Sequence, residues 1–452
     1  MGQAVVEDVD ADWLATLCAE RDPRSIAAAV AENVGSFGLV AGARLPTVRV
    51  MAGKIGVSAS TVAAAWALLR NDGIVETHRR GGTQIKAGPA IVHATTDRLD
   101  MSRAMPDPAL QPDLRDALMA GLHSQKLHSA DLDYVMPSLQ RCVAAQWTFP
   151  ADDWTIVGAS SESILVSVSA VAVRGDRIAV EQPTTPRLLR VLNRLGLIPI
   201  AIRWDLEGPQ ADDLLDALKS GAVAFVYQPR AQTPLGLSVT EGRAKRLAEI
   251  LSEFPRVAII EDEPLGPLVD GGGVSIGRWM PERTILVRSY CKAFGLDLRT
   301  SVIGGAASHI AAIREKRSMG LGVASRILQG ALLHLLSAPA AISATTKSQT
   351  EYKRRRTLLI SALQRHGITV SEGGDGLVVW LEVQDELKAA MRLAEHGLIV
   401  GRGEHYLADR SDGFIALSIG QLSEPEASVE WIAEAVANVV ALCSSSGPDG
   451  WD

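Results

Sequence analysis

The chain has 452 residues, enough for two domains, and its 47% hydrophobic content can supply one large core and one smaller core. With 21% charged and 4% aromatic residues, the composition fits a soluble α/β protein and excludes a disordered or fibrous one. The net charge of −7 is uneven, because residues 24–88 hold eight Lys or Arg against three acidic residues, a balance of +5 that leaves −12 for the remainder; such a basic segment is typical of nucleic-acid-binding proteins.

The cellular compartment follows from the cysteines and the apolar runs. No C-x-x-C pair occurs, so neither a disulfide framework nor a zinc site is expected. The N-terminus is acidic where a signal peptide is basic, and the longest apolar runs, such as residues 165–173, are too short to span a bilayer. We expect a cytoplasmic protein without a membrane partner, with 165–173 as a buried helix. The four cysteines are Cys18, Cys142, Cys291 and Cys443.

A helix-turn-helix is predicted within residues 47–73. The first helix begins at Thr47 and ends at the glycine of "IGVS". Either Ser58 or Ser60 caps the second helix, and "NDG" closes it. The apolar face of the second helix consists of Val62, Ala65, Trp66 and Leu69.

A wing follows the two helices. The runs "IVETH" and "TQIKA" predict two short strands around the turn "RRGG". The second helix presents hydroxyl groups and amides at its start for base edges and phosphates, and the wing arginines neutralise DNA charge. The alternative is a solvated helical hairpin beside a polar β-hairpin. The predicted DNA-binding residues are Arg49, Ser58, Ser60, Thr61, Arg70, Arg79, Arg80 and Thr83.

Residues 24–87 resemble the winged helix-turn-helix of GntR-type regulators. The stretches "ARLPTVR", "IGVSASTV" and "GGT" match the recurring motifs of that family in order and spacing. One departure is Ala59, where such domains usually carry an arginine. A base or phosphate contact is therefore missing, or Arg49 or Arg70 supplies it.

The remainder alternates apolar, β-branched runs with helical stretches such as "TEGRAKRLAEILSEF". This alternation predicts a mostly parallel sheet covered by helices, with ligands at the carboxyl ends of the strands. The predicted strands are 177–183, 222–229, 256–264, 284–290 and 301–306.

Chemically useful side chains fall at these strand ends. Individually, an aspartate there is most often a turn residue and a serine a helix cap. Together they match the needs of a pyridoxal phosphate site, which are a lysine for the Schiff base, a carboxylate for the pyridine nitrogen, and hydroxyls, amides and an arginine for the phosphate. The candidate residues are Lys292, Asp262, Ser289, Arg299, Ser160 and Ser161.

Residues 100–445 resemble fold-type I aminotransferases, through "GASSES", "QPRAQTPLG", "IIEDEP" and "SYCKAFGLDLR". A winged helix fused to this fold resembles the MocR-type transcriptional regulators. The resemblance implies a small winged helix-turn-helix domain at 1–88, a linker at 89–99, and an aminotransferase-like domain at 100–452 that binds the cofactor, senses an effector and dimerises. It also implies that Lys292 carries the cofactor, that Asp262 faces the pyridine nitrogen, and that the serines and Arg299 hold the phosphate.

Three positions depart from the aminotransferase pattern. Thr185 replaces a tyrosine that stacks on the ring, and Pro264 replaces a tyrosine that contacts the phenolic oxygen. Ala416 stands where the enzymes carry an arginine for the substrate carboxylate. The possible substitutes, each interpreted rather as an ordinary surface arginine, are Arg187, Arg402 and Arg410.

Three functions remain open, because a fold does not by itself confer an activity. The preferred hypothesis is a homodimeric regulator of double-stranded DNA that carries pyridoxal phosphate and is not an enzyme. The second is a regulator with a degenerate cofactor site that senses another ligand. The third, disfavoured by Ala416, is an active aminotransferase.

Overall fold

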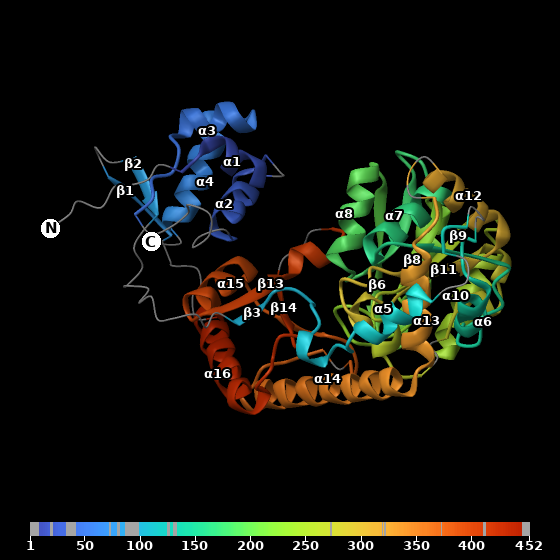
Figure 1. Cartoon of the computed structure of the whole chain (residues 1–452). Helices are drawn as coiled ribbons and strands as arrows, with labels where there is room; N and C mark the ends of the chain where they lie inside the picture. Colours follow the sequence, from blue (N-terminus) through green and yellow to red (C-terminus); the bar gives the residue numbers. More distant parts are fainter. Residues whose placement is uncertain are drawn as a thin grey trace. The chain divides into compact units, whose positions relative to one another are not determined.

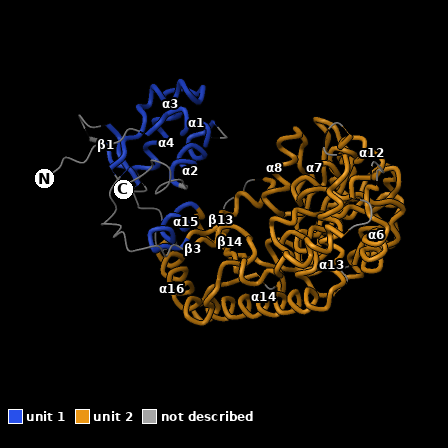
Figure 2. The backbone as a smooth tube through the Cα atoms, viewed as in Figure 1, with its two compact units in different colours: residues 1–98, 387–398 blue, residues 99–386, 399–452 orange. Residues whose placement is uncertain are grey.

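The computed structural model describes residues 9–18, 21–32, 42–71, 74–78, 82–85, 99–123, 127–129, 133–271, 274–318, 320, 322–371, 373–409 and 413–444. Arg79, Arg80, Arg410 and nearly all of the predicted linker lie outside these residues. The chain divides into two compact units, one of residues 1–98 with 387–398 and one of residues 99–386 with 399–452 (Figure 2). Within the described residues no single helix is long and apolar enough to cross a bilayer, and two helix pairs reach that threshold only across bends of 118° and 72°.

The first unit contains the predicted helix-turn-helix and the two strands of the wing. Helices α3 and α4 are bent by 118° relative to each other, and strands β1 and β2 pair antiparallel with Val75 opposite Ile85. The elements are α1 (Ala11–Leu17), α2 (Pro23–Glu32), α3 (Val48–Ile55), α4 (Ala59–Asn71), β1 (Val75–His78) and β2 (Gly82–Ile85).

Local chemistry sets the ends of the two central helices. The hydroxyl of Thr47 accepts a hydrogen bond from the amide of Val50, and α3 ends at Gly56, whose φ of 77° suits glycine. The hydroxyl of Ser58 accepts a bond from the amide of Thr61 at 3.1 Å, so Ser58 caps α4. The predicted apolar face of α4 is buried in a core that joins α1, α2 and α3.

The second unit is built around an eight-stranded sheet (Figure 1), and its strand order is β4-β11-β10-β9-β8-β5-β6-β7. Strands β10, β9, β8, β5 and β6 run parallel, whereas β11 is antiparallel to both of its neighbours and β7 is antiparallel to β6. The mostly parallel sheet is therefore confirmed. The strands are β4 (Asp153–Val157), β5 (Arg177–Gln182), β6 (Ile198–Asp205), β7 (Gly208–Pro209), β8 (Ala222–Tyr227), β9 (Ala258–Glu263), β10 (Thr284–Ser289) and β11 (Ser301–Gly305).

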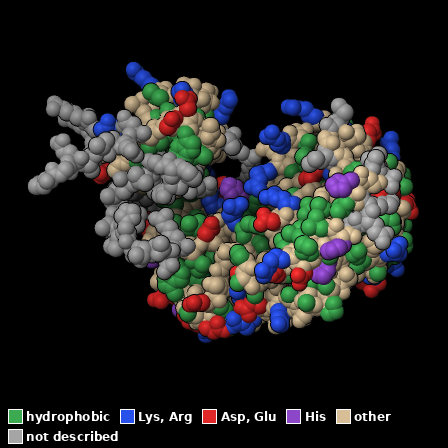
Figure 3. Space-filling model, viewed as in Figure 1, with side chains coloured by type: hydrophobic (Ala, Val, Ile, Leu, Met, Phe, Trp, Pro, Cys, Tyr) green, Lys and Arg blue, Asp and Glu red, His purple; other side chains and the backbone are tan. Residues whose placement is uncertain are grey.

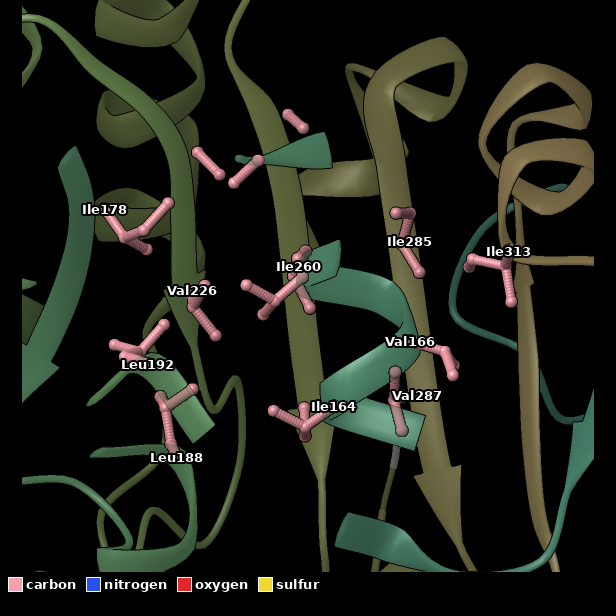
Figure 4. Close-up of a cluster of buried hydrophobic side chains, with 14 of the residues drawn as sticks. Ile164, Val166, Ile178, Leu188, Leu192, Val226, Ile260, Ile285, Val287 and Ile313 are labelled. Atoms are coloured by element: carbon pink, nitrogen blue, oxygen red, sulfur yellow. The ribbon is translucent and has the colours of Figure 1, made fainter. Parts of the chain in front are cut away.

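Helices cover both faces of this sheet. On one face α7 (Ser160–Val171), α8 (Pro186–Leu195) and α12 (Ala307–Ser318) bury apolar side chains against the strands (Figure 4). On the other face α9 (Ala211–Lys219) and α10 (Glu241–Ser252) do the same. The predicted buried helix at 165–173 is α7 in part, because the helix ends at Val171 and Leu165 and Val173 are exposed.

A four-stranded sheet with the order β12-β14-β13-β3 is the second sheet of this unit. Its strands are β3 (Leu99–Met101), β12 (Val378–Glu382), β13 (Leu398–Arg402) and β14 (Phe414–Ser418). The long helix α14 (Pro339–Arg365) packs against α16 (Pro425–Ser444). The remaining helices of this unit are α5 (Arg115–Leu122), α6 (Pro137–Ala144), α11 (Cys291–Phe294), α13 (Arg326–Ser337), and the short 3₁₀ helices Pro108–Leu110, Gly266–Leu268, Ile276–Arg278, Pro281–Arg283 and Gly403–Tyr406. Helix α15 (Glu386–Glu395) belongs to the first unit from residue 387 on.

Candidate cofactor pocket and DNA-binding surface

One edge of the eight-stranded sheet brings the predicted phosphate-binding residues together. Ser301, which begins β11, lies opposite Val157 at the end of β4 and opposite Ser289 at the end of β10. The loop that leads to Ser160 follows Val157, and Arg299 precedes Ser301 by two residues. The start of α7, Ser289 and Arg299 therefore meet at this edge, although the spacing of the three segments in the sequence is large.

Asp262 lies one strand further along the same edge. It stands opposite Val287 in the parallel pair of β9 and β10. Successive strand residues face opposite sides of a sheet, so residues two positions apart face the same side. Ile260 belongs to the core beneath α7 and α8, and Asp262, two residues later, therefore faces α7 and α8 as well. Lys292 lies in α11 and is half-buried. The charges of Asp262 and Lys292 act on each other's pKa, so these two side chains lie near each other, and with Ser160 and Ser289 they form the candidate cofactor pocket.

Arg187, the second residue of α8, completes this pocket. Its guanidinium Nη2 donates a hydrogen bond to the carboxylate Oδ2 of Asp262. The side chains of Arg187 and Asp262 are only 16% and 3% exposed. The interpretation of Arg187 as a surface arginine is therefore wrong, because a helix that packs on the sheet carries it inward beside a carboxylate.

The electrostatics of the pocket follow from burial. Burial raises the pKa of Asp262, and the positive charges of Arg187 and Lys292 oppose that shift. Burial and the nearby guanidinium of Arg187 lower the pKa of Lys292 to about 8, against the opposing effects of Asp262 and Cys291. At pH 7 about a tenth of a lysine with this pKa is the neutral, nucleophilic amine, far more than for an ordinary lysine.

Three buried polar atoms on the predicted site residues lack hydrogen-bond partners among the described residues. They are the hydroxyl oxygens of Ser160 and Ser289 and the Oδ1 atom of Asp262. Ser289 is fully buried, and Asp262 is 2% exposed. An unpaired buried polar group costs about 1–3 kcal/mol, so a cluster of three is typical of a site that a polar ligand completes.

The first turn of α7 offers additional donors. Its N-cap residue is Ala159, and no side chain caps the helix. The amide of Gly158 donates to the carboxylate of Glu162 at 2.8 Å, and Arg317 pairs with that carboxylate at 3.2 Å. Ser161 is exposed. Uncapped amides at a helix N-terminus favour an anion, so this end of the pocket is suited to a phosphate.

Arg299 has an unusual backbone conformation. Its φ is 45°, which is a left-handed conformation that costs a non-glycine residue about 1 kcal/mol or more. Its side chain is exposed and makes no hydrogen bond or ion pair with any residue that the structure describes. Such strain is concentrated in ligand clamps, and the guanidinium is available to an anion at the start of α7.

Two of the three departures from the aminotransferase pattern have visible structural consequences. The hydroxyl of Thr185 accepts a bond from the amide of Leu188, so this residue is the N-cap of α8. Ala416 is 1% exposed and packs in a cluster with Trp380 and Tyr406. Arg402 is also not a surface arginine, because it is 7% exposed and pairs with Glu386 and Glu404.

Three buried glutamates of the same sheet were not among the predicted site residues. Glu181 accepts bonds from the amide and side chain of Gln228, and burial raises its pKa to about 8. Burial also raises the pKa of Glu261 to about 7. Glu263 pairs with Arg230 and Arg288, and these arginines hold its pKa at about 2 against the effect of burial. Acidic residues inside the apolar runs "IAVEQP" and "AIIEDEP" were the available signal.

In the first unit, the start of α4 presents a cluster of hydroxyl groups. The hydroxyl of Ser58 lies 2.7 Å from that of Ser60 and 2.8 Å from that of Thr61. Ser58 and Ser60 are exposed, and Thr61 is half-buried. These residues can exchange their mutual bonds for bonds to DNA.

Basic side chains project around α3 in the same unit (Figure 3). Arg49 and Arg70 are exposed and make no ion pair with a described residue. Thr83 is half-buried and its hydroxyl lies 3.2 Å from that of Thr77 across the hairpin, so it belongs to the wing. The predicted contacts of Arg79 and Arg80 fall outside the described residues.

The chain matches two family models. Residues 24–85 match the bacterial regulatory proteins of the gntR family, and residues 102–427 match aminotransferase class I and II. The vitamin B6 salvage pathway transcriptional repressor PtsJ of Salmonella typhimurium is 30% identical, over 84% of this chain and 90% of that protein. The HTH-type pyridoxine biosynthesis transcriptional regulator PdxR of Corynebacterium glutamicum is 23% identical, over 89% of this chain and 92% of that protein.

A solved structure resembles most of this chain in its fold. Kynurenine aminotransferase of Pyrococcus horikoshii, in complex with PMP, superposes with a TM-score of 0.70 at 20% identity. The match covers 77% of this chain and 92% of that protein. It establishes the likeness of the fold.

Proposed function

The chain belongs to the MocR-type transcriptional regulators, in which a GntR-type DNA-binding domain is joined to an aminotransferase class I and II domain, and from this premise we propose that it binds pyridoxal phosphate at Lys292. We propose further that the bound cofactor, or a ligand that reacts with it, changes the affinity of the protein for its operator. The physical requirement is that the ligand binds one arrangement of the two domains better than another.

The observation that carries this proposal is the set of three unpaired buried atoms on Ser160, Ser289 and Asp262, in the pocket of Lys292. The residues present fit the group. The Ser160–Ser161 amides and hydroxyls, Ser289 and Arg299 would hold the phosphate, and Asp262 would hold the pyridine nitrogen. When bound, pyridoxal phosphate supplies an aldehyde and an electron-accepting ring.

Lys292 is suited to hold that aldehyde covalently. Its pKa of about 8 provides a neutral amine near physiological pH, and the pocket excludes much of the water around it. Asp262, as the buried acid nearby, orients the ring through its unpaired Oδ1. These roles concern binding, and none of them requires a second substrate.

We propose a role in sensing without turnover. The position equated with the substrate-carboxylate arginine is Ala416, which aromatic side chains cover. The names of two relatives refer to vitamin B6 salvage and to pyridoxine biosynthesis. We propose a B6 vitamer, or an amine or amino acid that reacts with it, as the effector class.

Double-stranded DNA is the proposed macromolecular partner, in the cytoplasm. A winged helix reads paired half-sites best as a dimer, and we propose a homodimer for that reason. The residues proposed for DNA contact are Arg49, Ser58, Ser60, Thr61, Arg70, Arg79, Arg80 and Thr83. Charge reversal at Arg79 and Arg80 should weaken binding to the region upstream of the protein's own gene in a gel-shift assay, and more strongly at low salt.

The cofactor proposal is tested by titrating the protein with pyridoxal phosphate and following its visible absorbance. We expect a band in the parent protein and in the exposed-lysine control Lys347→Ala, and no band in Lys292→Ala. A gel shift with and without the cofactor then tests the coupling to DNA. Equal affinity in both conditions would contradict the proposed regulation.

A second candidate is a regulator whose cofactor site is degenerate and which senses another ligand. It is favoured by Thr185, whose hydroxyl caps a helix, and by Pro264, which offers no hydroxyl. Absence of the absorbance band in the parent protein would select this candidate. Amino-acid turnover by the loaded protein would instead favour an active aminotransferase.

A further inference from the structure

The two carboxylate oxygens of Asp262 are not equivalent. Oδ2 accepts a hydrogen bond from Arg187, whereas Oδ1 is buried and has no partner among the described residues. The Nε atom of Arg187 is also buried without such a partner. The pair is thus shielded from water, and one of its oxygens remains available.

The packing of α8 holds Arg187 in this place. Leu188 and Leu192 of this helix point into the core that includes Ile260 (Figure 4). The hydroxyl of Thr185 caps the helix at its start. Because the helix is fixed at its start and along its buried face, the side chain of Arg187 is directed to Asp262 by the fold.

A guanidinium stays protonated at any physiological pH, so Arg187 is a permanent positive charge in the pocket. An unpaired aspartate beside a pyridine nitrogen favours the protonated ring, since an opposite charge stabilises the cation. An aspartate that is already paired with Arg187 provides less of this stabilisation. The same positive charge favours the neutral amine of Lys292.

Building on the proposed function, we infer that Arg187 is a positioning residue that shares Asp262 with the cofactor. The ring is then held through Oδ1 of Asp262, and the ring nitrogen is protonated less readily than it would be beside an unpaired aspartate. Protonation of the ring nitrogen is what makes the ring a strong electron acceptor. Arg187 therefore lets Asp262 hold the cofactor without making the ring the strong electron acceptor that turnover requires. It also keeps Lys292 reactive toward the aldehyde.

The first test follows the ring nitrogen directly. Pyridoxal phosphate labelled with ¹⁵N in the ring is bound to the parent protein, to Arg187→Gln, to Arg187→Lys and to Arg190→Gln, and the ¹⁵N chemical shift is measured against pH. Arg190 is the matched control, because it is exposed on the same helix. We expect protonation of the nitrogen at higher pH in Arg187→Gln, by about one unit. The control and Arg187→Lys should follow the parent.

The second test needs no cofactor. The pH dependence of Lys292 acetylation by trace acetic anhydride is measured by peptide mass spectrometry in the same proteins. The midpoint should rise by about one unit in Arg187→Gln, since both the lost cation and the freed carboxylate of Asp262 favour the charged amine. Arg187→Lys should retain the parent midpoint, which a purely structural role of Arg187 would not explain.

The outcomes separate the two proposals. If the parent binds the cofactor and both readouts are unchanged in Arg187→Gln, the inference is overturned and the proposed function stands. If the parent does not bind the cofactor, the proposed function fails and the ring-nitrogen part of the inference falls with it. The acetylation profile then decides whether Arg187 controls the charge of Lys292.

Discussion

Ala416 of β14 lies directly opposite Trp380 of β12 in the four-stranded sheet. The ring of Trp380 stacks on Phe414 with centroids 5.0 Å apart, and it meets Tyr406 edge-on at 5.3 Å. Aromatic side chains therefore fill the surroundings of the position that the sequence analysis equated with the substrate-carboxylate arginine of aminotransferases. The absence of that arginine is accompanied by a packed core at the same place.

Ala416→Arg is predicted to destabilise the protein without creating an aminotransferase. The longer side chain must displace Trp380 or Tyr406, and its charge finds no prepared partner, so the free energy of unfolding should fall by about 3 kcal/mol. Denaturant unfolding measures this change, with Ala427→Arg on the exposed face of α16 as the control. A stable Ala416→Arg protein that transaminates a common amino acid would contradict both the packing and the non-enzymatic role.

Glu263→Gln is predicted to destabilise the protein strongly at neutral pH. Glu263 is 1% exposed and lies between Arg230 and Arg288. Replacing its carboxylate with a neutral amide leaves these two buried arginines without a carboxylate partner. The loss should be about 3 kcal/mol or more. In the exposed pair of Arg246 and Glu249, the control Glu249→Gln should change stability by less than about 1 kcal/mol.

The effect of Glu263 also has a predicted pH dependence. Its pKa is about 2 in the folded protein and near the ordinary value of 4.5 when unfolded. A lowered folded pKa stabilises the protein above the unfolded pKa, and this contribution is lost as the pH falls toward the folded pKa. The difference in unfolding free energy between the parent and Glu263→Gln should thus shrink as the pH falls from about 4.5 to about 2. A difference that stays constant over this window would rule out the ion pairs as its cause.

Local sequence patterns predicted the parallel strands but not the second sheet. Strands β5, β8, β9 and β10 each contain an apolar run, because helices cover both faces of that sheet, and the predicted strand 301–306 is the antiparallel β11. The four-stranded sheet instead joins the three-residue strand Leu99–Met101 to strands that follow residue 377. No local pattern reveals such pairing, because it depends on how distant segments meet.

The candidate site was predictable where strand ends carry its residues, and less so where a helix does. Asp262, Ser289 and Lys292 follow recognisable apolar runs. The sheet places Asp262 and Ser289 at one edge, and Lys292 follows Ser289 by three residues in α11. Arg187 lies at the start of the amphipathic helix α8, and its partner Asp262 is 75 residues away in the sequence, so no local pattern pairs the two. The packing of Leu188 and Leu192 on the sheet directs Arg187 toward Asp262.

Arg49→Ala is predicted to weaken operator binding in a way that depends on salt. Arg49 is exposed near the start of α3, and one lost phosphate contact should reduce the slope of log affinity against log salt concentration by about one. Fluorescence anisotropy at several salt concentrations measures the slope. The control Arg194→Ala, exposed on α8 of the second unit, should leave it unchanged. An unaltered slope in Arg49→Ala would remove this residue from the proposed interface.

The outward face of α4 predicts a particular kind of base recognition. Ala63 and Ala64 are exposed there, so methyl groups stand where many recognition helices present hydrogen-bonding side chains. Apolar contact with the methyl group of thymine is the base contact that alanine can make. Replacing one contacted thymine by uracil should therefore weaken binding about fourfold, the equivalent of about 0.8 kcal/mol.

The effect of uracil should disappear in Ala63→Gly or Ala64→Gly, because the protein methyl group is then already absent. Comparing the ratio of thymine to uracil affinities within each variant cancels any loss of helix stability caused by glycine. If uracil is tolerated at every thymine of the operator, α4 reads the DNA through its hydroxyl groups and arginines instead.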